Sequence, residues 1–346
     1  MERVLTKKAN ALCHDYAITI IIRQQHRRPT AFPLDTAVRT IDLDSDIPHY
    51  EERLRDVLMR EHFDIVTTMG GYDMYFLYRI KDGSRKIFEF HFSFDISKVW
   101  LAGIRNPLKR WLWVRLQTWR RILIARHYEC VVVLCKADER KWRRYTHKVA
   151  TIYNPLMIHP DRMAACHNHV AIAVGRLDYQ KGFDYLIDAW KIVADKYSDW
   201  RLNIYGEGEL RDSLQKQIDQ NGLHDKITLC GRTANIVEKY LESSIFILSS
   251  RDEAFGLVIT EAEACGLPVV TFACPNAPAE LVDDGQNGYV IQKVGDIKTM
   301  AVRIEELIED ENQRKTMGKA SVAFADRFRE DKIWKEWKKL YSSVLV

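Results

Sequence analysis

The sequence predicts an α/β protein that is built from two doubly wound parallel-sheet domains. Short apolar runs of strand length alternate with helical segments through most of the 346 residues, and this alternation is typical of parallel sheets. The chain is also too long for one average domain. Lys and Arg outnumber Asp and Glu up to residue 160, whereas acids outnumber bases in the remainder, which favours two domains with different partners.

The expected domains are residues 1–160 and residues 161–330, followed by a helix over 331–346. Asn-Pro and His-Pro pairs between residues 154 and 160 interrupt the regular pattern and indicate a linker. We expect strands in the first domain at 17–22, 64–69, 86–90, 130–134 and 149–153. In the second domain we expect them at 169–174, 201–205, 227–230, 245–248, 269–273 and 289–291.

The first expected element is a helix over residues 1–15, which is unusual because α/β domains normally begin with a central strand. The first domain therefore apparently lacks its opening strand. Either residues upstream of Met1 are missing from this sequence, or the domain is built without that strand.

Composition favours a cytoplasmic protein. The seven cysteines form no CxxC pair and mostly lie in apolar runs, as expected for buried thiols in a reducing compartment. No apolar run approaches the ~20 residues of a membrane span, and no charged-then-apolar leader opens the chain.

The most informative stretch is residues 249–262, which follows an apolar strand at 245–248 and leads into a helix. Such a strand-to-helix turn lies at the carboxyl edge of a parallel sheet, where ligands bind, and a helix start suits a phosphate. Glu253 and Glu261 flank this turn. Carboxylates repel phosphate, so the two glutamates fit better as acceptors for hydroxyl groups. The simpler interpretation is that Glu253 caps the helix and Glu261 is solvated.

Flanking motifs decide between these readings. The spacing of Glu253 and Glu261 resembles the Glu-x7-Glu motif of the retaining GT-B glycosyltransferases of glycosyltransferase family 4. The resemblance continues through residues 175–182, 206–210 and 266–270, and is strong over about 150–346. It implies two Rossmann-like domains that face each other across a cleft, with the acceptor on the first, the nucleotide sugar on the second, and the last helix crossing back to the first.

The resemblance also implies the reaction. A sugar would move with retention from a nucleoside-diphosphate sugar, UDP favoured over GDP, to a sugar or lipid-linked glycan in surface polysaccharide assembly. No cofactor and no metal ion are expected, since the segment 42–46, which contains an Asp-x-Asp pattern, precedes a helix and its Asp and Ser residues are typical helix caps. The absent opening strand and its turn would have contacted the donor phosphates and acceptor.

Residue roles follow from the same motifs. Arg176 and Lys181 lie on one glycine-bounded turn and can converge on a diphosphate. By resemblance, Glu253 orients the sugar, Glu261 holds the ribose, and His91 lies near the donor sugar. The expected catalytic residues are His91, Arg176, Lys181 and Glu253. The expected donor-binding residues are Gly175, Gly206, Gly208, Arg232, Phe255, Gly256, Leu257 and Glu261.

Two other functions stay open from the sequence. A sugar-nucleotide 2-epimerase with the GT-B fold would interconvert UDP-sugars without an acceptor. A non-catalytic protein that binds sugar nucleotides or acts as a scaffold at a membrane would fit a first domain without its opening strand. The loop at 273–280 also departs from the family pattern, so the resemblance does not indicate the sugar.

Residues 96–128 form an unusual segment with eight basic residues and no acid. Asn106 and Pro107 predict a helix start, and apolar residues then recur at helical spacing among tryptophans. A basic amphipathic helix with tryptophan suits an anionic bilayer, so residues 98–127 could contact a membrane peripherally. A domain helix whose apolar stripe belongs to the core fits equally well. Nucleic acid is not an expected partner, because no recognition motif accompanies the charge.

Overall fold

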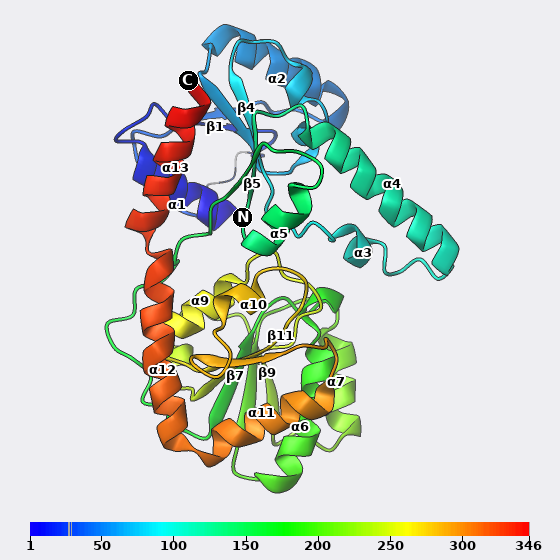
Figure 1. The fold of residues 1–346 in the computed structure, drawn as a ribbon, viewed down its shortest axis with the longest axis vertical. Helices are drawn as coiled ribbons and strands as arrows, with labels where there is room; N and C mark the ends of the chain where they lie inside the picture. Colours follow the sequence, from blue (N-terminus) through cyan, green and yellow to red (C-terminus); the bar gives the residue numbers. More distant parts are fainter. Residues whose placement is uncertain (27, 29, 346) are drawn as a thin grey trace.

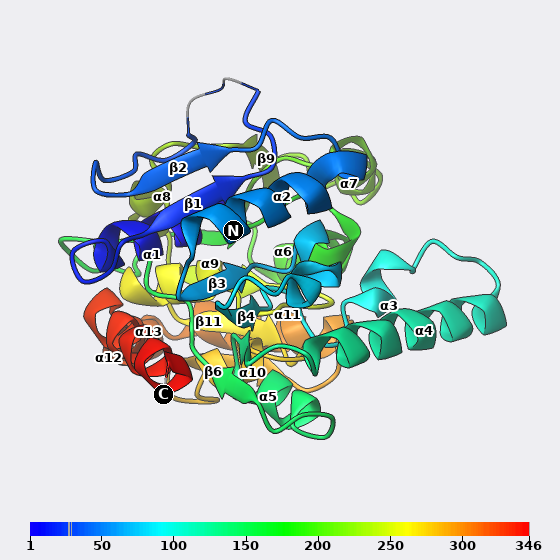
Figure 2. The ribbon, with the colours of Figure 1, turned by 90° about the horizontal axis from the view of Figure 1, so that it is seen from above.

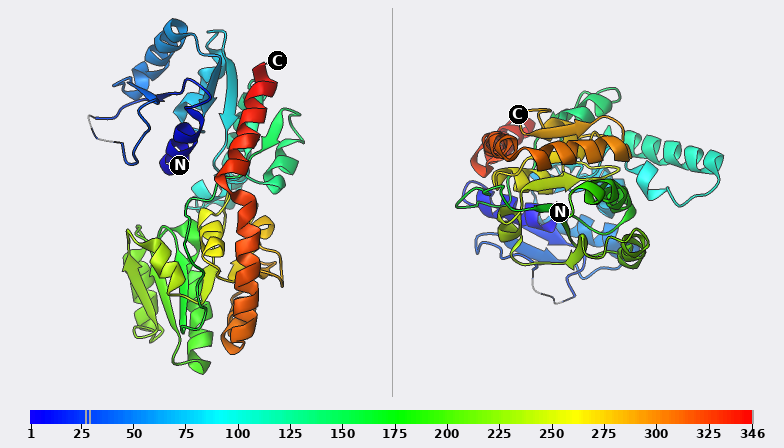
Figure 3. Two further views of the ribbon diagram at one scale, coloured as in Figure 1. Left: turned by 90° about the vertical axis from the view of Figure 1, so that its left-hand side faces the viewer. Right: turned by 90° about the horizontal axis from the view of Figure 1, so that it is seen from below.

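The computed structural model describes residues 1–26, 28 and 30–345, so the last expected residue of the C-terminal helix, Val346, lies outside them. Two lobes are stacked along the long axis of the molecule, and the N-terminus lies near their junction (Figure 1, Figure 3). Each lobe contains parallel strands with helices packed against them. The predicted α/β class with two Rossmann-like domains is therefore confirmed.

The second lobe has one six-stranded sheet, in the order β12-β11-β10-β7-β8-β9, in which every neighbouring pair is parallel. Its centre is apolar because strands covered on both faces need continuous apolar runs, such as the fully buried β10. The strands are β7 (Val170–Val174), β8 (Arg201–Tyr205), β9 (Ile227–Gly231), β10 (Ile245–Leu248), β11 (Val269–Phe272) and β12 (Gly288–Ile291).

Helices cover both faces of this sheet, in keeping with the predicted alternation of strands and helices. They are α6 (Phe183–Lys196), α7 (Arg211–Gln220), α8 (Ile236–Leu241), α9 (Leu257–Ala264), α10 (Pro278–Leu281), α11 (Ile297–Glu309) and α12 (Glu311–Ala325). Short 3₁₀ turns, η3 (Tyr179–Lys181) and η4 (Asp326–Phe328), complete the lobe.

The first lobe carries a four-stranded parallel sheet and a separate parallel pair of strands. The sheet has the order β3-β4-β5-β6, and the pair is β1 with β2. These strands are β1 (Thr19–Ile22), β2 (Arg39–Asp42), β3 (Ile65–Thr68), β4 (Arg85–Glu89), β5 (Cys130–Val133) and β6 (Val149–Thr151). The other elements are α1 (Glu2–Leu12), α2 (Ile47–Glu61), η1 (Tyr72–Tyr75), η2 (Leu77–Arg79), α3 (Ser97–Trp100), α4 (Pro107–Ala125) and α5 (Lys136–Trp142).

The strands of the first lobe form two separate groups, which fits the expectation that this domain lacks its opening strand. β1 pairs only with β2, and β3 pairs only with β4, among the strands of the described residues. A cavity of about 120 Å³ is lined by Thr19 and Ile21 from β1 and by Ile65 and Thr67 from β3. Each of these two strands therefore has an edge without a strand partner. Strand β2 was not predicted, because its residues are mostly exposed and therefore form no apolar run.

The C-terminal helix α13 (Glu330–Leu345) follows α12 and crosses to the first lobe (Figure 1). Its Ile333, Trp334 and Trp337 are buried against Leu12 of α1 and Ile87 of β4. A helix that continues from the second lobe thus contributes to the core of the first.

Helix α4 projects away from the first lobe, together with the short α3 (Figure 2). Asn106 caps it as expected, because its side chain accepts a hydrogen bond from the Lys109 amide at 3.0 Å. Most of the apolar stripe is exposed, including 78% of Leu108 and 58% of Trp111. The reading in which this stripe belongs to the core is therefore wrong for most of the helix, because α4 leaves the lobe instead of covering its sheet; Ile122, near its end, is buried.

Candidate functional site

The candidate site is built on the turn between β10 and α9, at the carboxyl edge of the second sheet. Gly256 precedes α9 with a φ of 92°, a conformation that residues with a Cβ rarely adopt. Phe255 is buried beside Tyr153 and Phe328, and this packing fixes the turn. The first amides of α9 therefore face the edge of the sheet, where a helix start can bind an anion.

Lys181 and Glu253, two of the predicted catalytic residues, meet at this turn. The Lys181 ammonium forms an ion pair with the Glu253 carboxylate, and Ser250 Oγ donates to the same oxygen at 2.9 Å. Gly182 makes the approach possible, because a Cβ there would lie 2.3 Å from the Ser249 carbonyl oxygen. Since both side chains are largely buried, the pair is shielded from bulk water.

The glycines of the two neighbouring loops serve the same close packing. A Cβ on Gly206 would lie 1.8 Å from the Gly175 carbonyl oxygen, and one on Gly208 would lie 2.3 Å from the Leu177 carbonyl oxygen. The Leu177 amide also donates to the Glu207 carbonyl at 3.0 Å. The loops after β7 and β8 thus lie backbone to backbone beside the Lys181 turn.

Unlike Lys181, the two predicted arginines, Arg176 and Arg232, do not contact Glu253 among the residues that the structure describes. Arg176 pairs with Asp178 of its own loop at 3.1 Å, and its side chain is 74% exposed. Arg232, after β9, is also exposed. The structure thus brings Lys181 to Glu253, whereas Arg176 and Arg232 are at the surface, and their roles stay predictions.

Glu261 lies one helical turn into α9 and is buried. Its Oε1 accepts a hydrogen bond from Arg3 of α1 at 3.1 Å, and Tyr240 Oη lies 3.5 Å from its Oε2. Burial raises the pKa of Glu261, and the nearby Arg3 opposes this shift. The simple reading of Glu261 as a solvated residue is therefore wrong, because α8 and α1 cover it.

His91 follows β4 in the first lobe, where its Nε2 lies 2.9 Å from Glu89 Oε1. Lys8 of α1 forms an ion pair with the same carboxylate, and all three side chains are buried. Burial alone would raise the pKa of Glu89, but Lys8 and His91 outweigh it and hold the pKa at about 2. His91 is thereby fixed by an ionised carboxylate at the end of the strand.

Several contacts between the lobes had no signal in the sequence. Ser93 Oγ donates to Asp252 Oδ2 at 2.9 Å, and Lys141 Nζ donates to Asn276 Oδ1 at 2.8 Å. The Glu280 carboxylate accepts from the amides of Lys136 and Ala137 at 2.8 and 2.5 Å, so it caps α5 from the opposite lobe. The sequence gives little indication of this last contact, because a helix start does not show which distant acid will cap it.

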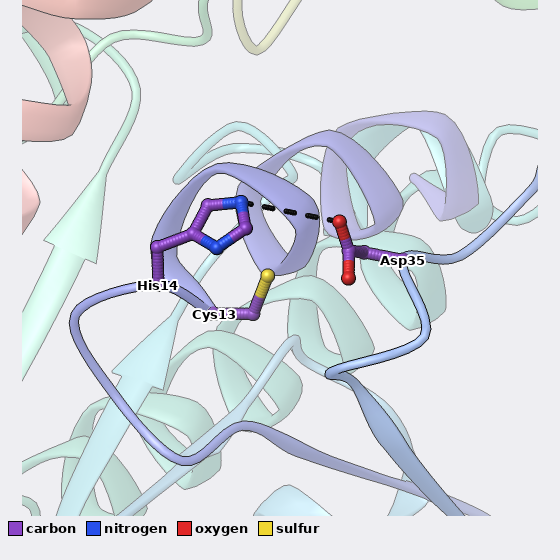
Figure 4. A group of neighbouring side chains, drawn as sticks. All are labelled: Cys13, His14 and Asp35. Atoms are coloured by element: carbon purple, nitrogen blue, oxygen red, sulfur yellow. Dashed lines mark ion pairs between the residues drawn. The ribbon is translucent and has the colours of Figure 1, made fainter.

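A different cluster lies at the other end of α1 (Figure 4). Cys13, His14 and Asp35 bring one sulfur, one imidazole and one carboxylate within 4.8 Å of one another, and His14 Nε2 lies 3.9 Å from Asp35 Oδ2. Cys13 follows the last residue of α1 and Arg3 is in its first turn, so about 15 Å of helix separates the cluster from the backbone of Arg3. It is separate from the turn at Glu253.

The Asp-x-Asp pattern has a structural role. The Asp42 carboxylate accepts from the Gln25 and Asp44 amides, at 3.1 and 3.0 Å. Asp46 caps α2 by accepting from the His49 amide at 3.2 Å. The prediction that this segment caps a helix is confirmed.

The fold and this edge of the second sheet define a class: glycosyltransferases with the GT-B fold. Residues 166–323 match the family model described as glycosyl transferases group 1. This part of the chain is therefore similar to glycosyl transferases group 1, in line with the resemblance to glycosyltransferase family 4.

Known proteins support this assignment. An uncharacterized glycosyltransferase of Haemophilus influenzae is 29% identical over 97% of this chain and 94% of its own length. The amylovoran biosynthesis glycosyltransferase AmsD of Erwinia amylovora is 32% identical, but the match covers 53% of this chain and 51% of that protein. The chain thus spans about half the length of that relative.

Solved structures share the fold over almost the whole chain. Sucrose-phosphate synthase of Thermosynechococcus elongatus superposes with a TM-score of 0.83, at 18% identity, over 98% of this chain and 92% of that one. Anabaena HepE in complex with UDP superposes with a TM-score of 0.76, at 18% identity, over 99% and 96%. In the part of the chain that the structure describes, no helix is both long and apolar enough to cross a bilayer.

Proposed function

We propose that this protein transfers a sugar, with retention, from a nucleoside-diphosphate sugar to a glycan or lipid-linked acceptor. The observation that carries the proposal is the meeting of Lys181 and Glu253 beside the first amides of α9. A cation and a helix start suit the diphosphate, and carboxylates suit hydroxyl groups on either side of it. UDP is the favoured nucleotide, in line with the UDP present in related structures such as that of HepE.

In the proposed mechanism, negative charge develops on the departing diphosphate as the glycosyl bond loosens. Lys181 and the amides of Phe255, Gly256 and Leu257 stabilise that charge without a metal ion, and Arg176 contributes from the rim. These groups are held in place before the donor binds, so little reorganisation is needed. The donor phosphates then replace Glu253 as the partner of Lys181, which frees the Glu253 carboxylate for hydroxyl groups of the sugar.

The remaining residues position the donor. Glu261 accepts from the ribose, and His91, fixed by Glu89, faces the transferred sugar. Gly175, Gly206 and Gly208 let the backbone approach the donor, and Arg232 lies toward the base. Neither glutamate acts as a covalent nucleophile, because Glu253, beside Lys181, and Glu261, beside Arg3, both bind hydroxyl groups of the donor. The chain divides at about residue 160 into an acceptor lobe and a donor lobe.

The acceptor belongs to surface polysaccharide assembly. Relatives include a capsular polysaccharide biosynthesis glycosyltransferase of Staphylococcus aureus, which is 30% identical over about half of this chain. Helix α4 supplies a further argument, because it exposes Leu108, Trp111, Leu112 and Trp113 among basic residues. Such a helix fits the surface of an anionic bilayer, with each Lys or Arg near the surface adding about 1 kcal/mol. At the surface of the bilayer the enzyme would bind a lipid-linked acceptor.

Binding and turnover test the proposal together. Calorimetry with UDP, GDP and their sugars should show UDP binding to the wild type, with affinity reduced about tenfold or more in Lys181→Ala, because a charged hydrogen bond is lost. Lys191→Ala, on exposed α6 beside Asn221, is the matched control and should bind as the wild type does. Glu253→Gln should retain UDP but lose turnover of the UDP-sugar.

Other results point elsewhere. Binding without any hydrolysis or transfer would favour the non-catalytic reading, and interconversion of UDP-sugars without an acceptor would favour the epimerase. No binding to any nucleotide would refute the donor site. Flotation with vesicles tests the membrane contact: a Lys109→Glu/Arg110→Glu/Arg115→Glu variant should lose binding to phosphatidylglycerol vesicles, whereas Lys216→Glu on α7 should not.

A further inference from the structure

The basic residues of α1 connect this helix to three other elements. Arg3 pairs with Glu261 of α9, Lys7 with Glu330 at the start of α13, and Lys8 with Glu89 at the end of β4. Of these three pairs, the Arg3 pair is the one that reaches α9, the helix of the candidate site. No motif in the sequence assigns a function to Arg3.

Arg3 is held at both ends of its guanidinium. Nη1 donates to Glu261 Oε1 at 3.1 Å, and Nη2 donates to the Met157 carbonyl at 2.6 Å. The Arg3 side chain is 38% exposed, whereas that of Glu261 is 7% exposed. Arg3 is therefore the more accessible partner of this pair, and Glu261 is largely covered.

The other neighbours of Glu261 leave its carboxylate free for further hydrogen bonds. Tyr240 of α8 lies 3.5 Å from Oε2, and Cys265, at the end of α9, is the other titratable group that interacts with it. Arg3 is the one cation that faces it among the described residues. An ionised carboxylate offers about four acceptor positions. In Glu261 the hydrogen bond from Arg3 occupies one of them, and the contact with Tyr240 is long.

We propose that Arg3 is a positioning residue for the donor: it fixes the Glu261 carboxylate, ionised, so that the free oxygen accepts from the ribose hydroxyls. This inference rests on the proposed function, because it deepens the role given to Glu261. Burial raises the pKa of Glu261, so without Arg3 the carboxyl would be protonated up to a higher pH. A protonated carboxyl is a poorer acceptor, and its rotation would no longer be restricted.

The experiment compares UDP binding by calorimetry at pH 6 and pH 8 in the wild type, Arg3→Gln, Arg3→Lys and Glu261→Gln. Arg3→Gln should weaken UDP binding about tenfold at pH 6, because the charge-assisted interaction that orients Glu261 is lost. The loss should be smaller at pH 8 than at pH 6, because removal of Arg3 raises the pKa of Glu261 further and a higher pH opposes protonation of the carboxyl. Arg3→Lys, which keeps the charge, should recover part of the affinity at pH 6.

A second readout separates positioning from structure. The wild type should prefer UDP over 2′,3′-dideoxy-UDP, and Arg3→Gln should reduce this preference in the same direction as Glu261→Gln does. Lys7→Gln is the matched control, since it removes another cation of α1 that pairs with Glu330, away from Glu261. It should bind both nucleotides as the wild type does.

Three results would overturn the inference. If Glu261→Gln loses affinity while Arg3→Gln binds as the wild type does at both pH values, Arg3 has no role in binding and the donor site stands. If Arg3→Gln and Lys7→Gln lose affinity equally, with the same preference between the nucleotides, the role is structural. If the wild type binds no nucleotide, the proposed function fails and the role of Arg3 falls with it.

Discussion

Asp252 should make the stability of the protein depend on pH in the neutral range. Its carboxyl is 3% exposed, and Oδ1 has no hydrogen-bond partner in the described structure. Burial raises the pKa of Asp252 from an ordinary value of 3.8 to about 7. The hydrogen bond from Ser93 opposes this shift, and the neighbouring Glu253 adds to it. A raised pKa means that the folded protein binds the proton more tightly than the unfolded chain does.

The sign and size follow from this shift. The stabilising contribution is fully present below the unfolded pKa near 4 and is lost as the pH rises to about 7 and above. The whole shift corresponds to roughly 4 kcal/mol, of which about half, on the order of 2 kcal/mol, falls between pH 5 and pH 8. Asp252→Asn cannot ionise, so it should lose none of this stability over that interval.

The assay is thermal unfolding of the wild type and Asp252→Asn at pH 5 and pH 8. Burying the new amide group lowers stability by a similar amount at both pH values. The Tm of Asp252→Asn relative to the wild type should nevertheless rise by about 5 °C from pH 5 to pH 8. Asp212→Asn, at an exposed position of α7, should show no such change. An equal Tm difference at both pH values would mean that Asp252 does not titrate there, and the reasoning would be wrong.

Three more predictions concern the fold. Glu280→Ala removes both hydrogen bonds that cap α5, and we expect a loss of about 1 kcal/mol, measured as a lower Tm than that of the exposed control Glu311→Ala. Trp190→Ala, fully buried in the core of the second lobe, should cost about 3–5 kcal/mol in denaturant unfolding; a loss below 1 kcal/mol would contradict the packing. Amides of β1 and β3 should exchange hydrogen faster than those of β7, which is paired on both sides, and equal protection would refute the open edges.

The second lobe could be predicted from the sequence because its signals are local. Apolar runs such as β10 and helix ends at glycine or proline are set by neighbouring residues, and every expected strand there is present. The first lobe was harder to predict from the sequence. Strand β2 was not predicted, because its residues are mostly exposed to solvent. The projection of α4 depends on which surface the rest of the chain leaves uncovered.

The site divides in the same way. Lys181 and Glu253 follow adjacent strands of one sheet, β7 and β10, so the motifs were sufficient to place both residues at the same edge, but not to predict their ion pair. The partners of Glu261, Asp252 and Glu280 come from the opposite lobe or from helices far away in the sequence. Nothing in the spacing of Arg3, Ser93 or the α5 amides indicates these pairs, since they depend on how the lobes are placed.

These contacts between the lobes have a consequence for the reaction. Glu261 and Asp252, which make two of them, belong to the same turn and helix that we propose to hold the donor. A donor that binds Glu261 therefore acts on a residue that also joins the lobes, so donor binding and lobe closure should be coupled in free energy. If closure brings His91 and the acceptor to the donor, then weakening Ser93–Asp252 should lower turnover more than it lowers UDP affinity. Ser93→Ala, assayed for both quantities, tests that coupling, and an unchanged UDP affinity would show that the lobes close independently of the donor.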